Sequence, residues 1–142
     1  MPVKEQLMNP AIWFDLTIMG KSIGYFTSVK GLKAEVETLT YNEGGMNEFV
    51  HKLPTRVKYP NLVLKRGVTS SADLQTWFQK THREAERTTI TITMLNEYGD
   101  RLRSWQFVNA FPVKWEGPDF DAAQNTLATE TIEISHDGVK TA

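Results

Sequence analysis

The chain of 142 residues contains no cysteine, which excludes a disulfide framework and metal sites with thiolate ligands. Its formal net charge is only −1, so the bulk charge gives no attraction toward nucleic acid or a membrane surface. No segment has the roughly 20 consecutive apolar residues that a membrane-spanning helix needs. The first ten residues include Lys4 and Glu5 and have no apolar core, so no signal peptide is predicted.

Motifs for catalysis and for cofactor binding are also missing. The three histidines, His51, His82 and His136, are too far apart in sequence to show the spacing of metal ligands. The tripeptide Gly20–Ser22 resembles the end of a phosphate-binding loop, but Asp15 stands where that loop needs its first glycine. The sequence therefore predicts a protein that is not an enzyme and that has no cofactor and no metal site.

Alternation with period two dominates what remains, and it is typical of half-buried β-strands. The length fits one domain, residues 1–142, with a core that buries about 70% of the unfolded chain's surface. We expect a mainly β fold, a β-sandwich or barrel-like pair of packed antiparallel sheets. The alternating apolar residues are Ile12, Phe14, Leu16 and Ile18; Leu32, Ala34 and Val36; Ile90, Ile92 and Met94; and Ala128, Ile132 and Ile134. Shorter strands are expected at Asn61–Lys65, Leu102–Val108 and Phe111–Trp115, with a hairpin turn at Asn96–Gly99.

One segment has helical spacing instead. Ser70 with Asp73 three residues later forms a helix start, and an apolar stripe follows at positions i, i+3, i+4 and i+7. The stripe consists of Leu74, Trp77, Phe78 and Thr81. We therefore expect one flanking helix, about Ala72–Glu86, packed on a sheet.

A long polar loop is expected at Tyr41–Pro60, which contains Gly44, Gly45 and Pro54. Loops of this length are uncommon in compact domains unless they serve a function or are disordered. The loop also carries apolar residues, Phe49 and Leu53 among them, that argue against permanent disorder. We expect it to pack on a neighbouring subunit.

Charge is unevenly distributed along the chain. The stretch Lys52–Arg66 is basic without an acid, and Glu116–Asp137 is acidic without a lysine or arginine. The basic stretch could bind nucleic acid through phosphate contacts and stacking. Alternatively, the basic stretch of one subunit could face the acidic stretch of the next, because such head-to-tail contacts generate rings or filaments. Both stretches could also simply be solvated.

Seven stretches of sequence resemble the tail tube family of contractile phages, phage-tail-like bacteriocins and extracellular contractile injection systems. They are Phe26–Val36, Tyr41–Gly45, Lys52–Pro54, Lys58–Gly67, the helix pattern of Leu74 and Trp77, Asn109–Asp119 and Glu130–Gly138. The block at Asn109 is close to the family's N-A-W-P-x-K-W-x-G-P-D, with Phe111 in place of tryptophan. The order and spacing of the blocks, rather than any single one, carry the resemblance.

The resemblance implies a structural subunit that forms stacked hexameric rings around a hollow channel. It further implies that one sheet of each subunit joins its neighbours into a closed barrel. The implied partners are other copies of the chain, a contractile sheath protein, baseplate and tube-terminating proteins, and cargo in the channel. Assembly would occur in the bacterial cytoplasm, before the tube becomes part of a released particle or virion. A ring-forming relative from a type VI secretion system would keep this architecture in another setting.

Within that framework, the loop residues expected to make contacts between subunits are Tyr41, Gly44, Gly45, Phe49, Lys52, Leu53, Arg56 and Lys58. Leu32, Ala34 and Val36 are expected to face the core, with Lys33, Glu35 and Glu37 toward the channel or a ring face. Thr89, Thr91 and Thr93 are expected to line the channel.

Overall fold

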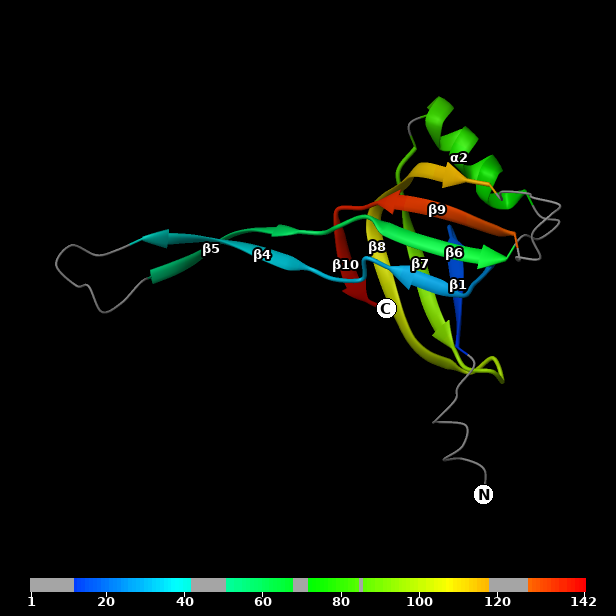
Figure 1. The fold of residues 1–142 in the computed structure, drawn as a ribbon, viewed down its shortest axis with the longest axis horizontal. Helices are drawn as coiled ribbons and strands as arrows, with labels where there is room; N and C mark the ends of the chain where they lie inside the picture. Colours follow the sequence, from blue (N-terminus) through cyan, green and yellow to red (C-terminus); the bar gives the residue numbers. More distant parts are fainter. Residues whose placement is uncertain (1–11, 42–50, 68–71, 85, 118–127) are drawn as a thin grey trace, which may run out of the picture.

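The computed structural model describes residues 12–41, 51–67, 72–84, 86–117 and 128–142, with only the backbone of Tyr41 and His51. Eight of its strands follow one antiparallel hydrogen-bonded arrangement in which the long strand β8 (Arg101–Glu116) belongs to two layers (Figure 1). The first half of β8 pairs with β7 (Thr88–Leu95) and β10 (Gly138–Thr141), and its second half pairs with β9 (Thr129–Ser135). The expected β-rich fold with two packed sheets is confirmed.

The larger sheet has the order β2-β1-β7-β8-β10. The smaller sheet has the order β8-β9-β6-β3. The strand bounds are β1 (Trp13–Ile18), β2 (Lys21–Phe26), β3 (Ser28–Lys30), β6 (Leu62–Gly67), β7 (Thr88–Leu95), β9 (Thr129–Ser135) and β10 (Gly138–Thr141).

The core lies between the two sheets and follows the alternation of the sequence. The larger sheet contributes Leu16 and Ile18 of β1 and Ile90 and Ile92 of β7, which are all buried. The smaller sheet buries pairs of neighbours across its strands, such as Leu64 of β6 opposite Ile132 of β9. Helix α2 (Asp73–Glu84) contacts β8 and buries Leu74 and Thr81, so the expected helix is confirmed with ends two residues or fewer from those predicted.

The expected strands Leu102–Val108 and Phe111–Trp115 are a single strand, β8. Between them lies Asn109, which has a φ of 52°. Asparagine is among the few residues that tolerate such a conformation. The backbone thus changes direction at this residue without ending the strand, which is how β8 passes from one sheet to the other.

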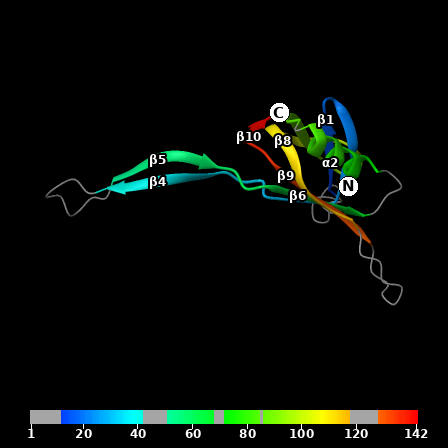
Figure 2. The same ribbon diagram turned by 90° about the horizontal axis from the view of Figure 1, so that it is seen from above.

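The remaining two strands form a separate hairpin, β4 (Glu35–Tyr41) with β5 (His51–Lys58). The hairpin projects away from the packed sheets, as both Figure 1 and Figure 2 show. The expected loop Tyr41–Pro60 is therefore wrong for Tyr41, the last residue of β4, and for residues 51–58, which are β5. Residues 42–50 of the expected loop lie outside the described residues. The expectation that Ala34 and Val36 face the core is also wrong, because both are exposed.

A projecting hairpin as the candidate assembly site

The hairpin is long and extends away from the packed sheets of its own subunit (Figure 2). Strands β4 and β5 have seven and eight residues. At about 3.3 Å per residue, the paired region spans roughly 25 Å. Neither strand pairs with a strand of the two packed sheets. A two-stranded ribbon is marginally stable by itself in water, so contacts with another surface are expected to stabilise it.

The root of the hairpin, residues 31–34 and 59–61, holds the two legs close together. Gly31 has a φ of 92°, and a Cβ built there would lie 2.1 Å from the backbone oxygen of Asn61. Only glycine permits this approach. On the other leg, the ring of Tyr59 lies 5.6 Å from the ring of His136, which belongs to the body of the molecule.

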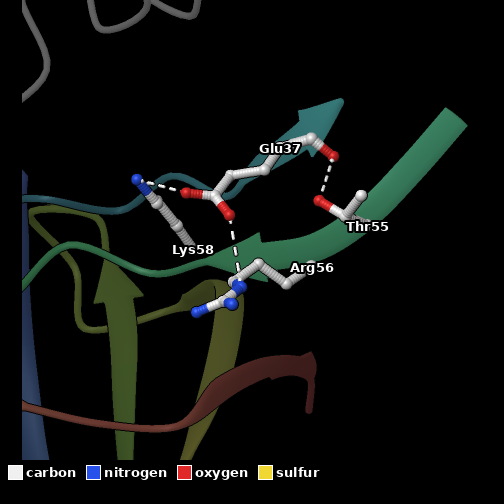
Figure 3. A network of polar contacts seen from close by, with 4 residues as sticks. All are labelled: Glu37, Thr55, Arg56 and Lys58. Carbon is white, nitrogen blue, oxygen red and sulfur yellow. Dashed lines mark hydrogen bonds and ion pairs between the residues drawn. The ribbon is translucent and has the colours of Figure 1, made fainter. Parts of the chain in front are cut away.

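Polar contacts fix the pairing near the root (Figure 3). The carboxylate of Glu37 lies 3.2 Å from Nε of Arg56 and 2.5 Å from Nζ of Lys58. Thr55 donates its hydroxyl to the backbone oxygen of Glu37 at 3.0 Å. The hydrogen bond to Glu37, followed by the charge of that carboxylate, raises the pKa of Lys58 above its ordinary value.

A β-bulge brings these groups together. Val36 pairs with Val57 and Thr38 pairs with Pro54, so Thr55 and Arg56 both stand opposite Glu37. Such an extra residue redirects side chains and increases the local twist. Here it allows Arg56 and Lys58 to reach one carboxylate from the same strand.

Large apolar side chains line the hairpin and are exposed to solvent. They form two cross-strand pairs, Val36 with Val57 and Leu39 with Leu53. The exposed fractions are 49% for Val36, 46% for Val57, 56% for Leu39 and 47% for Leu53. Because Val36 and Leu39 are three residues apart on β4, the two pairs lie on opposite faces of the ribbon. Exposed apolar groups on a projecting element of this kind mark surfaces that bind a partner. The hairpin is therefore the best candidate in the described chain for an interface.

The residues predicted to contact neighbouring subunits fall on this hairpin where they are described. Lys52 and Leu53 lie on the outer part of β5, and Arg56 and Lys58 lie near the root. Tyr41 ends β4, where its backbone pairs with His51. Gly44, Gly45 and Phe49 lie outside the described residues. Val36 and Leu39 are the interface candidates that the sequence analysis missed. The apolar residues on both segments indicate two strands that could pair, with Val36 and Leu39 opposite Val57 and Leu53. Pro54 argues against a strand in the second segment.

The residues predicted to line the channel lie in two separate places. Glu35 and Glu37 belong to β4 and Lys33 precedes it, so these three lie at the base of the hairpin. Thr89, Thr91 and Thr93 lie on β7, where they alternate with buried Ile90 and Ile92. The threonines therefore occupy the outward face of the larger sheet.

The stretch Lys52–Arg66 does not form one exposed basic surface. Arg66 is only 3% exposed and pairs with Glu130 inside the core. Arg56 and Lys58 are exposed, but both pair with the carboxylate of Glu37, which offsets part of their charge. Nothing in the described residues favours nucleic-acid binding. Among those residues, no cluster of three or more histidine, aspartate or glutamate side chains could hold a metal ion. No helix in the described part is long and apolar enough to cross a membrane.

Comparison with known proteins agrees with this geometry. The sequence profile of the T4-like virus tail tube protein gp19 matches residues 10–140. A chain from the sheath–tube complex of PVC, an extracellular contractile injection system, in its extended state is 30% identical to this chain, with a TM-score of 0.78. The match covers 91% of this chain and 87% of that one.

A chain of the anti-feeding prophage baseplate is 26% identical with a TM-score of 0.75, covering 92% and 91% of the two chains. Hcp1 from Flavobacterium johnsoniae is 19% identical with a TM-score of 0.55, covering 92% and 94%, and shares the fold. No curated protein sequence matches. The chain therefore belongs to the T4-like virus tail tube protein gp19 family and is a tail tube subunit of contractile injection systems.

Proposed function

We propose that this chain assembles into hexameric rings that stack into the hollow inner tube of a contractile particle. The observation that supports the proposal best is the hairpin, which carries four exposed apolar side chains away from its own core. A contact between a projecting element and a different surface of the next copy is head-to-tail, and such contacts generate closed rings or stacked filaments.

The proposed partners follow from the similar structures. One is a sheath–tube complex, another is a baseplate and a third is a tube-terminating cap. We infer that this tube is surrounded by a sheath whose contraction drives it through a target envelope. The tube would begin at a baseplate, end at a cap and hold cargo in its channel. We also infer assembly within the producing bacterial cell, release as an extracellular particle, and a structural rather than catalytic role.

The hairpin residues Leu39 and Leu53 would supply the apolar part of the subunit contact. Lys52 would act at its margin, since rim charges contribute more to register and association rate than to affinity. Gly44, Gly45, Phe49 and Tyr41 would extend the same contact. Lys33, Glu35 and Glu37 would lie at a ring face, because they surround the root of the hairpin.

Two sheet faces are candidates for the channel wall. The first is the face with Thr89, Thr91 and Thr93, whose short uncharged side chains would not bind cargo. The second is the outward face of the smaller sheet, where Lys65 and Thr131 pair across β6 and β9. What favours this second face is that β3 and the last part of β8 each pair on one side only within the described chain. Their free edges are available to join neighbouring copies into a closed sheet.

Labelling of single cysteines distinguishes the two faces, because the chain has no cysteine of its own. If Thr91 faces the channel, Thr91→Cys in assembled tubes is expected to react with a small charged thiol reagent. It is expected to resist a maleimide carried on a long polyethylene glycol chain, which the channel excludes. Thr131→Cys is then expected to react with neither or with both. The reverse pattern would assign the channel to the smaller sheet.

The ring itself is tested by native mass spectrometry of the purified chain. We expect a species of six copies in equilibrium with the monomer. A closed ring of another number would overturn the hexamer, and monomers at every concentration would count against self-assembly of the isolated chain.

A further inference from the structure

A buried histidine lies where the hairpin meets the body of the molecule. His136 stands between β9 and β10 and is 6% exposed. Its ring centroid lies 4.9 Å from that of Phe107, edge to face, and 5.6 Å from that of Tyr59. Tyr59 is the first residue after β5, so the imidazole touches the hairpin leg directly.

The environment of this imidazole suits its neutral form. Within the described residues, neither ring nitrogen makes a hydrogen bond of good geometry, although backbone groups of Gly138 and Pro60 lie near enough to favour the charged ring. Burial lowers the pKa of His136, and the nearby backbone groups of Gly138 and Pro60 oppose the shift without cancelling it. A proton on this ring would leave a buried charge without a well-aligned acceptor, which is costly.

The charged and titratable groups around His136 give little compensation. Asp137 is the carboxylate whose charge raises the pKa of the ring. It is exposed, accepts a hydrogen bond from Nδ2 of Asn109 at 3.1 Å and lies 3.9 Å from Arg87. From the hairpin leg the phenol of Tyr59 faces the ring, and from β8 the neighbour is the apolar ring of Phe107.

Tyr59 is also positioned by its other neighbours. A Cβ built on Gly138 would lie 3.8 Å from the Tyr59 ring, so that ring covers the start of β10. Across the root, Gly31 packs against the backbone of Asn61, two residues after Tyr59. Because Gly31 and Asn61 hold the two legs close together at this point, we infer that the direction of the whole hairpin depends on the position of the Tyr59 ring.

We propose that His136 is a positioning residue for the hairpin, and that its protonation in mild acid releases Tyr59 and lets the hairpin leave its assembly-competent direction. The effect on tubes rests on the proposed function, whereas the effect on hairpin direction does not. The arrangement in which Tyr59 packs on the neutral ring of His136 has its full stability above the ordinary imidazole pKa of about 6.5, and it loses stability as the pH falls below that value.

Pulsed electron paramagnetic resonance on the unassembled chain tests this directly. Spin labels at Lys52→Cys on the hairpin and Gln75→Cys on α2 use two exposed positions in a chain without other cysteines. We expect one narrow distance distribution at about pH 7.5 and a second population in mild acid. Linkage to one proton lets the ratio of displaced to packed hairpin rise by up to about tenfold per pH unit.

The matched variant is His136→Phe, which keeps an aromatic ring that cannot be protonated, and it is expected to retain the narrow distribution in mild acid. His51→Gln and His82→Gln remove the other two histidines and are expected to leave the acid response intact. A labelled chain with native His136 whose distribution stays narrow in mild acid would overturn the proposal, and so would an unchanged acid response in His136→Phe.

Tubes of the native chain are expected to dissociate in mild acid, and tubes of His136→Phe are expected to persist. Failure to form tubes at any pH would count against the proposed function, while the distance measurement would still decide the role of His136.

Discussion

Replacing Arg66 with alanine is expected to destabilise the folded subunit by about 3–5 kcal/mol, because the variant leaves the Glu130 carboxylate buried without its partner. Arg66 and Glu130 are directly opposite each other on β6 and β9, and they are only 3% and 8% exposed. Nε of Arg66 donates to Oε1 of Glu130 at 3.1 Å, and Nη2 lies 3.0 Å from the same oxygen without a well-aligned hydrogen bond.

The guanidinium also joins the two sheets. It lies 5.1 Å from the ring centroid of Phe26 on β2, and a Cβ built on Gly24 of β2 would approach Nη1 to 2.4 Å. Arg66→Ala therefore removes packing between the sheets as well as a charge. Gly24→Ala is expected to destabilise the fold too, although the flexible end of Arg66 can move aside in part.

Urea unfolding of the monomeric variants measures this effect. The matched control is the double variant Arg66→Met with Glu130→Leu, which replaces both charges with apolar side chains of similar size. Such replacements are often neutral or stabilising by about 1–4 kcal/mol, so the double variant is expected to unfold near or above the unsubstituted chain. If Arg66→Ala lost less than about 1 kcal/mol, the pair would have to be solvated rather than buried.

The second large effect concerns assembly. Leu39→Asp combined with Leu53→Asp is expected to leave a folded monomer, because both side chains are exposed and lie outside the buried core. Tube formation is expected to be lost, since burying a carboxylate without a partner in an interface costs several kcal/mol. At about 1.4 kcal/mol for each factor of ten, two such groups weaken each subunit contact by more than roughly 100-fold.

Circular dichroism tests whether this variant is folded, and sedimentation with electron microscopy measures its assembly. Met19→Asp is the matched control, because Met19 is a 74% exposed apolar residue on the body, in the turn after β1. Its φ of 54° is one that aspartate tolerates. Normal tubes from the hairpin variant would exclude the Leu39–Leu53 pair from the interface.

Much of the fold could be predicted because the alternation of single strands reports which face is buried. The pattern of β7 places Ile90 and Ile92 inward, and that of β9 does the same for Ile132 and Ile134, as the structure has them. The stripe of α2 was equally informative. In these elements, the partner surface is the core of the same chain, so the sequence pattern and the burial agree.

The hairpin could not be predicted in this way, because its apolar residues have no partner within the subunit. Val36 follows Leu32 and Ala34 in strict alternation and so resembles a core position, yet it is 49% exposed. Pro54 argues against a strand, although an edge strand tolerates a proline whose missing N–H would face solvent. Sequence alternation identifies a side that is to be buried, but it does not show whether the same chain buries it.

Arg66 shows the opposite limitation. It is in phase with buried Leu62 and Leu64, and Glu130 is in phase with buried Ile132 and Ile134. Charged residues are rarely buried unless they are paired. The pairing here joins residues 64 positions apart, and only the register of β6 against β9 reveals it.

The central claim, that this chain builds a tube through its hairpin, is tested most directly by electron microscopy of the purified protein over a concentration series. We expect hollow tubes of one diameter with six-fold cross-sections, in which each hairpin lies against a neighbouring copy. Particles that remain single subunits at every concentration, both alone and in the presence of a purified baseplate of the same system, would contradict the claim.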